Sequence, residues 1–239
     1  MHTEVPHSAP WSSVETLAWP EIQALQLALL QTQLQYLAAR SVFYQRKFTA
    51  VGVQPADIRS LADLARIPMT TKQELRDSLQ AAPLLGLHQA ADWRDIVQVQ
   101  ASSGTTGSPA YVGLTQADQV NWSEMTARGL YACGIRPHDT VLHAFSMSKG
   151  FVGGIPIWQG VSRIGAVDIP VGADGGVDRL LIAARDAHPR CIVGTPNFLL
   201  YLAQVAPTLI GRSATSLGVE RLVELIREAA PPALPSPLD

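Results

Sequence analysis

The sequence predicts an α/β fold in which a helical N-terminal region packs on a mostly parallel sheet with helices on both of its faces. Apolar residues recur at helical spacing over residues 1–90. From about Asp95 onward, short β-rich runs alternate with helical stretches, which favours parallel strands joined through helices. Hydrophobic residues make up 47% of the 239 residues, which is enough for a sizeable core.

Residues 1–90 are expected to form the helical region. Between Ile22 and Leu37 the apolar positions recur at steps of three to five residues, a spacing that gives a helix one buried stripe. Thr71 stands three residues before Glu74, which is the spacing of a capping box at a helix start. Two further helical segments are expected at residues 41–48 and from residue 60 onward.

Residues 91–228 are expected to form a partial α/β domain. Thr115, three residues before Asp118, is expected to cap its first helix. The β-rich runs lie at 96–100, 111–114, 140–145, 166–170 and 191–195, and one more strand is expected within 216–223. The helical stretches between them are 116–133, 154–163, 177–187 and 197–205. This alternation predicts a mainly parallel sheet that is covered on both faces.

Residues 229–239 are expected to form a disordered tail. Four prolines within residues 231–237 prevent the chain from continuing a helix or a sheet. A sheet that gives way to such a tail looks incomplete.

Composition narrows the class of protein. The net charge of −2 argues against nucleic acid and anionic membrane as partners. Cys133 and Cys191 lie far apart in apolar stretches and are expected to be buried free thiols, which suits a reducing cytoplasm. The start of the chain lacks the pattern of a secretory signal, and residues 22–30 are too few to span a bilayer. Histidines such as His138 and His188 are expected at the surface. No spacing of His, Cys, Asp or Glu residues suggests a metal cluster.

One stretch carries the chemistry: Ser-Ser-Gly-Thr-Thr-Gly-Ser-Pro at residues 102–109, between two predicted strands. Gly104 and Gly107 permit backbone conformations in which successive N–H groups turn toward one anion. The hydroxyl groups that add donors for phosphate oxygens belong to Ser102, Ser103, Thr105 and Thr106. The spacing of the glycines does not match that of a Walker loop or a dinucleotide fingerprint, and the Gly-x-Ser-x-Gly pattern of a nucleophile elbow is absent from the sequence. The alternatives are a polyphosphate cradle and a merely polar hairpin loop.

Residues 101–107 closely resemble the phosphate-loop signature of the adenylate-forming superfamily, and the sequence around them is similar to phenylacetate–coenzyme A ligases. The similarity runs from about residue 30 to about residue 205, with several motifs in order. The matching segments are Phe-Tyr-Gln-Arg-Lys-Phe at 43–48, Ile-Pro-Met-Thr-Thr-Lys-Gln-Glu-Leu-Arg at 67–76, Val-Gly-Leu-Thr at 112–115, Gly-Phe-Val-Gly-Gly at 150–154 and Gly-Thr-Pro-Asn-Phe-Leu-Leu at 194–200.

This resemblance implies a two-step reaction with ATP and coenzyme A as cofactors and Mg2+ in the complete enzyme. A carboxylate attacks the α-phosphate of ATP, and the thiol of coenzyme A then displaces AMP from the acyl-adenylate. Residues 102–107 would hold the β- and γ-phosphates, with Lys72 either a second phosphate contact or a solvated lysine at a helix start. Phe145 and Phe151 would line the pocket for the acyl or aryl group, or else serve ordinary core packing. No catalytic residue is assigned.

The sequence also departs from the family. Ser108 follows Gly107 where many members have lysine, which is expected to weaken pyrophosphate neutralisation by about 1–3 kcal/mol. Around residues 145–149 the family pattern is altered, so the particular acid is not specified. The later motifs, including the magnesium-binding glutamate and the C-terminal lysine domain, are not found after Val223. The chain therefore resembles an N-terminal half only. It is expected to be a truncated product, a half completed by a second polypeptide, or a remnant or binding domain that keeps the loop without turnover.

Overall fold

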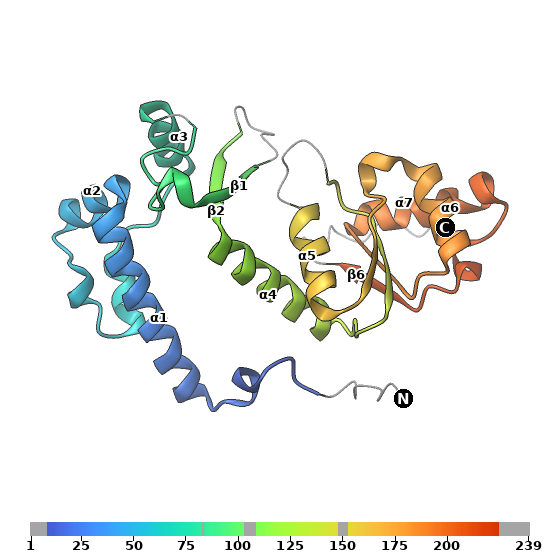
Figure 1. The fold of residues 1–239 in the computed structure, drawn as a ribbon, viewed down its shortest axis with the longest axis horizontal. Coiled ribbons are helices and arrows are strands. Elements are labelled where there is room, and N and C mark those ends of the chain that lie inside the picture. The colour runs from blue at the N-terminus through green and yellow to red at the C-terminus, as the bar shows by residue number, and fades with distance from the viewer. Residues whose placement is uncertain (1–8, 83, 103–108, 148–152, 225–239) are drawn as a thin grey trace, which may run out of the picture. The chain divides into compact units, whose positions relative to one another are not determined.

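The structure is a computed structural model that describes residues 9–82, 84–102, 109–147 and 153–224. The chain divides into two compact units, Pro10–Val120 and a second one that begins at Asn121. We call them the helical unit and the sheet unit (Figure 1). The predicted division after residue 90 stays a prediction, and the predicted tail, 229–239, lies outside the described residues.

The helical unit confirms the predicted helical region. Its longer helices are α1 (Trp19–Arg40), α2 (Val42–Val51) and α3 (Lys72–Ala81). The short 3-10 helices are Ser13–Thr16, Pro55–Asp57, Leu61–Arg66 and Trp93–Asp95. Its small core consists of Leu34, Phe48, Val53 and Ile58.

The predicted buried stripe of α1 is only partly correct. Leu34 is 5% exposed and packs against the core of the helical unit, whereas Leu25 is 39% and Leu29 is 62% exposed. The residues of α1 that join this core are Leu34 and, partly buried, Leu30, Leu37 and Ala38, all from its C-terminal half. Periodicity identifies an apolar face but does not say what covers it.

The predicted capping box at Thr71 and the predicted cap at Thr115 are both present. The Glu74 backbone N–H donates to Thr71 Oγ1 over 3.2 Å, and the Thr71 N–H donates to Glu74 Oε2 over 2.6 Å. The Asp118 N–H likewise donates to Thr115 Oγ1, and the Thr115 N–H donates to Asp118 Oδ2. These bonds satisfy backbone donors that a helix start otherwise leaves unpaired.

Lys47 ties α2 to the start of α3. Its Nζ donates to Glu74 Oε1 over 2.9 Å and to the Met69 carbonyl over 3.0 Å, and the residue is 8% exposed. The same carboxylate therefore caps α3 and pairs with a buried ammonium. Hydrogen bonds from the Thr71 N–H and from Lys47 lower the pKa of Glu74 from its ordinary 4.5 to about 2.

Glu74→Gln is expected to make folding less sensitive to acid. Because the folded pKa of Glu74 lies below the unfolded one, its contribution to the free energy of unfolding is fully present above about pH 4.5 and is lost as the pH falls toward 2. Urea titrations between pH 6 and pH 2.5 should show a smaller loss of stability for the variant than for the wild type. Parallel pH profiles would contradict this expectation.

The sheet unit contains an all-parallel sheet, so the predicted fold class is confirmed. Its strands are β3 (Thr140–His143), β4 (Val167–Ile169), β5 (Cys191–Gly194) and β6 (Arg221–Glu224), in the order β4-β3-β5-β6. The helices α5 (Gly154–Ile164), α6 (Val177–Ala187) and α7 (Pro196–Ile210) connect them. The helix α4 (Gln116–Ala132) precedes β3 in the chain.

Two predicted strands do not join this sheet. β1 (Ile96–Ala101) and β2 (Tyr111–Thr115) pair with each other as an antiparallel hairpin in the helical unit. The nine residues between them, 102–110, are too few for the crossover of a dozen or more residues that parallel strands need. Loop length therefore decides against the parallel arrangement expected for residues 96–114.

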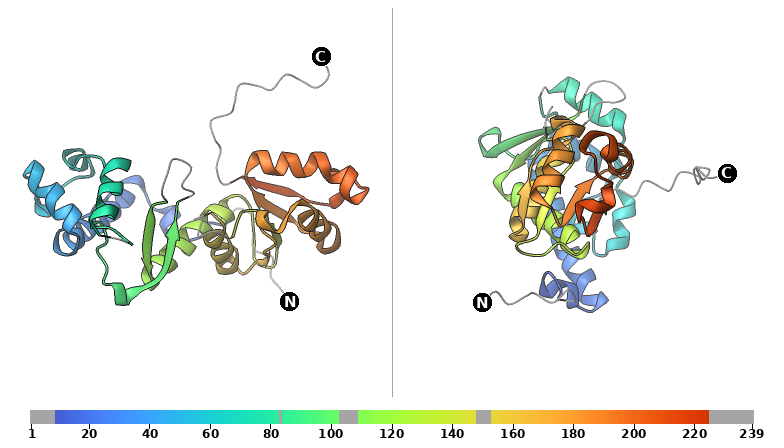
Figure 2. Two further views of the ribbon diagram at one scale, coloured as in Figure 1. Left: turned by 90° about the horizontal axis from the view of Figure 1, so that it is seen from above. Right: turned by 90° about the vertical axis from the view of Figure 1, so that its right-hand side faces the viewer.

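Alternation along the strands gives the sheet two apolar faces. Leu142, Ala144 and Ile192 point to a core shared with α6 and α7, whereas Val141, His143 and Val193 belong to the opposite face. The helix α5 packs on β3 and β4, on the side of the sheet away from α6 and α7 (Figures 1 and 2). Both faces of the sheet are thus covered by helices, as predicted.

The two cysteines differ in their exposure to solvent. Cys191 is fully buried on β5, and burial raises the pKa of its thiol from 9.0 to about 11. Cys133 is exposed, which contradicts the prediction, because α4 ends at Ala132 and Cys133 lies in the turn beyond it. Both thiols are free. Among the described helices, none is long and apolar enough to cross a membrane.

Candidate functional site

The hairpin formed by β1 and β2 presents the predicted phosphate loop. The Ser102 N–H donates to the Ala110 carbonyl over 2.9 Å, and the Ala110 N–H donates to Ser102 Oγ over 3.0 Å. Ser102 therefore closes the base of the loop with its backbone N–H and with its hydroxyl oxygen. Ser103, Gly104, Thr105, Thr106 and Gly107 lie outside the described residues.

The base of this hairpin is tightly packed. A Cβ on Gly113 would lie 2.7 Å from Leu85 Cδ1 and 3.0 Å from Ile96 Cδ1, so only glycine fits there without displacing its neighbours. Ala101, the last residue of β1, is 6% exposed. The two strands stay paired up to Ala101 and Tyr111, next to Ser102 and Ala110.

Gln100 is a residue that sequence reasoning missed. Its side chain is buried, with 2% of the residue exposed, and neither its amide oxygen nor its amide nitrogen has a hydrogen-bond partner among the described residues. Buried polar groups are normally paired, so an unpaired amide two residues before the loop is unusual. The signal in the sequence was a glutamine within an apolar strand.

Lys72 is the first residue of α3 and is exposed, directly after the capping residue Thr71. It lies in the same unit as the hairpin. Its predicted contact with phosphate stays a prediction.

Phe145 lies at the topological switch point of the sheet. The chain leaves β3 for β4 on one side through α5 and returns to β5 on the other side through α6, so the carboxyl ends of β3 and β5 meet where the strand order reverses. Ligands of open α/β sheets bind at such points. Phe145 lies two residues beyond the end of β3 and is 6% exposed. Phe151, the other predicted pocket residue, lies outside the described residues.

Beneath Phe145 lies a buried polar pair that the sequence did not reveal. His143 Nδ1 is 3.5 Å from Asp168 Oδ2, and their side chains are 0% and 4% exposed. The rings of His143 and Phe145 meet edge to face, with centroids 6.4 Å apart. None of the polar side-chain atoms of this pair has a hydrogen-bond partner among the described residues. The prediction of surface histidines is therefore wrong for His143, although it is confirmed for His138 and His188.

Asp174 links the loops that follow β3 and β4. Its Oδ2 accepts hydrogen bonds from Ser146 Oγ over 2.7 Å and from the Met147 N–H over 2.9 Å. The start of α5 packs closely beside them, because a Cβ on Gly154 would lie 2.2 Å from the Ser146 carbonyl oxygen. Ser146 and Met147, which lie beyond the carboxyl end of β3, thus contact Asp174, and Ser146 also packs against the start of α5.

The fold of this chain is similar to that of solved adenylate-forming coenzyme A ligases. The chain matches a 2-hydroxyisobutyryl-CoA ligase in complex with 2-HIB-AMP and CoA with a TM-score of 0.82 and 30% identity, over 92% of this chain and 48% of that one. An open conformation of the same ligase gives a TM-score of 0.81 and 28% identity, again over 92% of this chain.

The resemblance to phenylacetate–coenzyme A ligases is confirmed. The chain is 37% identical to the enzyme of that name from Escherichia coli, over 84% of this chain and 45% of the relative. It is 34% identical to that of Thermus thermophilus, over 90% and 48%, and 33% identical to that of Pseudomonas putida, over 80% and 42%. No protein-family model matches the chain. The chain spans about half the length of the curated relatives it matches.

Proposed function

We propose that this chain supplies the phosphate loop and part of the acyl pocket of an ATP-dependent acyl- or aryl-coenzyme A ligase. The substrate is a carboxylic acid, which is first adenylated and then transferred to the thiol of coenzyme A. The observation that carries the proposal is the hairpin whose loop Ser102 and Ala110 close at its base, since this is the strand–loop–strand setting that the phosphate-loop motif requires. The similarity to ligases that bind acyl-adenylates supports it.

The donor chemistry of the hairpin fits a polyphosphate. The hydroxyl and backbone N–H groups of residues 102–107 would hold the β- and γ-phosphates through charge-assisted hydrogen bonds, with Lys72 as a second contact. The unpaired amide of Gln100 adds a buried donor near the base of the same loop. Phe145 and Phe151 would exclude water around the acyl or aryl group.

We assign no residue of this chain to Mg2+. Among residues 9–82, 84–102, 109–147 and 153–224, no group of three or more His, Cys, Asp or Glu side chains lies together as a metal site requires. We propose that the contacts with the metal, the adenine and the catalytic lysine come from a second polypeptide that carries the remaining half of the ligase. Two free thiols fit a reducing compartment, so we place the reaction in the cytoplasm.

The second candidate function is a domain that binds phosphate without turnover. It differs from the ligase in that the phosphate loop is kept while the contacts for turnover are not assembled. Binding energy depends on the contacts that remain, so the chain by itself is then expected to bind ATP or pyrophosphate only weakly.

ATP–pyrophosphate exchange on the purified chain, with a panel of aryl and acyl acids, tests the proposal. We expect no exchange by the chain alone and measurable exchange once the C-terminal half of a related ligase is added. Strong exchange by the chain alone would contradict its dependence on a second polypeptide. Pyrophosphate binding without exchange in either case would favour the domain without turnover.

A further inference from the structure

The helix α1 carries a second apolar stripe, on the side away from the core of the helical unit. Leu25 lies nine residues before the buried Leu34, which is about two and a half helical turns, and Tyr36 lies two residues after it, about half a turn. Both residues are therefore on the opposite side of the helix from Leu34. Leu25, Leu29 and Tyr36 are 39%, 62% and 40% exposed. Large apolar side chains that gather at a surface mark an interaction site.

This stripe, which we call the outer stripe, follows the heptad repeat of a coiled coil. Apolar and small residues recur at alternating steps of three and four, the spacing of the seam along which two helices pack. The first member of the outer stripe is half-buried and the others are exposed. The members are Ile22, Leu25, Leu29, Thr32, Tyr36 and Ala39.

The helix α1 is almost without charged side chains. Over its 22 residues it has Glu21 at its start and Arg40 at its end, and its other polar side chains are glutamine and threonine. A helix that faces water usually carries charged residues on its outward side. A helix that lies on a membrane surface carries many lysines and arginines on its polar side. The outward side of α1 therefore fits a neighbouring helix better than it fits water or a lipid surface.

The outer stripe is complementary to itself in an antiparallel pair of helices. A twofold axis between Leu30 and Gln31 brings every member of the stripe opposite another member on a second copy of this chain. A parallel pair would instead place Tyr36 against Tyr36 and Ala39 against Ala39, two neighbouring layers of very different width. The facing pairs of the antiparallel arrangement are Ile22 with Ala39, Leu25 with Tyr36, and Leu29 with Thr32.

The two ends of α1 favour the same antiparallel arrangement. Trp19 is the first residue of α1 and is 63% exposed, and Arg40 is its last residue and is also exposed. The two residues are three heptads apart and so lie on one flank of the outer stripe. The antiparallel pair brings Arg40 of one copy beside Trp19 of the other, where a guanidinium is attracted to the face of an indole ring. A parallel pair would bring the two Arg40 side chains together, and their charges would repel.

We propose that the outer stripe of α1 is an interface at which two copies of this chain pair, with their α1 helices antiparallel. This inference goes beyond the proposed ligase function and does not depend on it.

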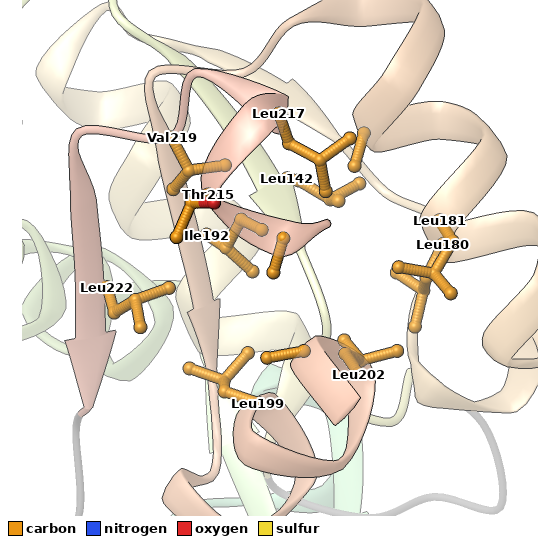
Figure 3. Close-up of a pocket in the computed structure, with 13 residues that line it drawn as sticks. Leu142, Leu180, Leu181, Ile192, Leu199, Leu202, Thr215, Leu217, Val219 and Leu222 are labelled. Carbon is orange, nitrogen blue, oxygen red and sulfur yellow. The ribbon is translucent and has the colours of Figure 1, made fainter. Parts of the chain in front are cut away.

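The sheet unit has an apolar surface that serves as a control. Leu222 on β6 is 60% exposed, close to the 62% of Leu29. It lies beside a cavity of about 300 Å3 in which Thr215 is the one polar side chain among the lining residues (Figure 3). The lining residues come from strands, from helices and from the segment between α7 and β6, so they form no single stripe with a heptad repeat. A dimer that used this surface would respond to a change at Leu222 rather than at Leu29.

Light scattering of the full chain during size-exclusion chromatography is the first test. The wild type is expected to have twice the 25.7 kDa mass of one chain. Leu29→Lys should raise the dissociation constant of the dimer at least about a hundredfold, because the twofold axis buries two unpaired ammonium groups, each of which costs about tenfold or more. The matched control Leu222→Lys should leave the dissociation constant within about twofold.

Cysteine cross-linking tests the register and the direction of the pair. In a chain that also carries Cys133→Ser, the double variant Leu25→Cys with Tyr36→Cys should form disulfide-linked dimers on mild oxidation, since the two positions face each other. Leu25→Cys alone should not, because the two copies of this position lie about 17 Å apart along the antiparallel helices. A parallel pair would give the opposite result for the single variant.

Four results would overturn the inference: a monomeric wild type, a dimer that Leu29→Lys leaves intact, a dimer that Leu222→Lys dissociates, or cross-linking by Leu25→Cys alone. Circular dichroism at 222 nm shows whether Leu29→Lys keeps its fold. If it does not, the cross-linking of the double cysteine variant decides the question, and its failure to cross-link would count against the antiparallel pair.

Discussion

Replacing Thr105 and Thr106 together by alanine is expected to abolish pyrophosphate binding by this chain. The proposed cradle loses two hydroxyl donors to a charged group, and each such hydrogen bond contributes about 1.5–3 kcal/mol. The combined loss corresponds to at least about a hundredfold weaker binding, since each 1.4 kcal/mol is a factor of ten. Because the wild type is itself expected to bind weakly, calorimetric titration with pyrophosphate should detect no binding by the double variant.

The control for this pair is Thr32→Ala with Thr49→Ala. Both hydroxyls lie on helix surfaces of the same unit and donate only to the carbonyls of Ala28 and Gln45. This variant should bind pyrophosphate as the wild type does. Equal binding by the wild type and the Thr105/Thr106 variant would remove the loop from the proposed site, and the alternative of a polar hairpin would then hold.

His143→Leu is expected to destabilise the sheet unit by about 3–5 kcal/mol, since it removes the ionisable group that lies 3.5 Å from the buried Asp168 carboxylate. The side chain of Asp168 is 4% exposed, and its Oδ2 lies 3.5 Å from His143 Nδ1. The free energy of unfolding at pH 7, from urea titration followed by circular dichroism, measures the effect.

The double variant His143→Leu with Asp168→Leu is the matched control. Replacing both members of a buried pair by apolar residues of similar volume is often close to neutral, so the double variant should be more stable than His143→Leu alone by about 2 kcal/mol or more. A double variant that is less stable than the single one would show that the pair is not the cause. The loss would then come from packing around Phe145.

Features that depend on neighbours in the sequence were predicted well. The capping bonds between Thr71 and Glu74 and between Thr115 and Asp118 join residues three positions apart, so their spacing alone indicates them. The helix α6 runs from Val177 to Ala187 as expected, and β5 begins at Cys191 as expected. In these cases one periodic segment carries its own signal.

Burial was predicted poorly because it depends on distant parts of the chain. Cys133 is exposed and His143 is fully buried, against expectation in both cases. Lys47 is also buried, because Glu74 and the Met69 carbonyl come from a segment more than twenty residues away. Residue type gives only an average tendency, whereas the fold decides which neighbours cover a side chain.

The sequence by itself determined the α/β class and the order of the helices and strands, including the two strands that flank the glycine- and hydroxyl-rich segment, because these follow from local periodicity. Only the tertiary structure decided that β1 and β2 form a separate antiparallel hairpin, that Phe145 lies over the buried pair of His143 and Asp168, and that Leu222 stands uncovered at the edge of the sheet. These facts depend on which strands pair and which helices cover them, and no single segment of the chain contains that information.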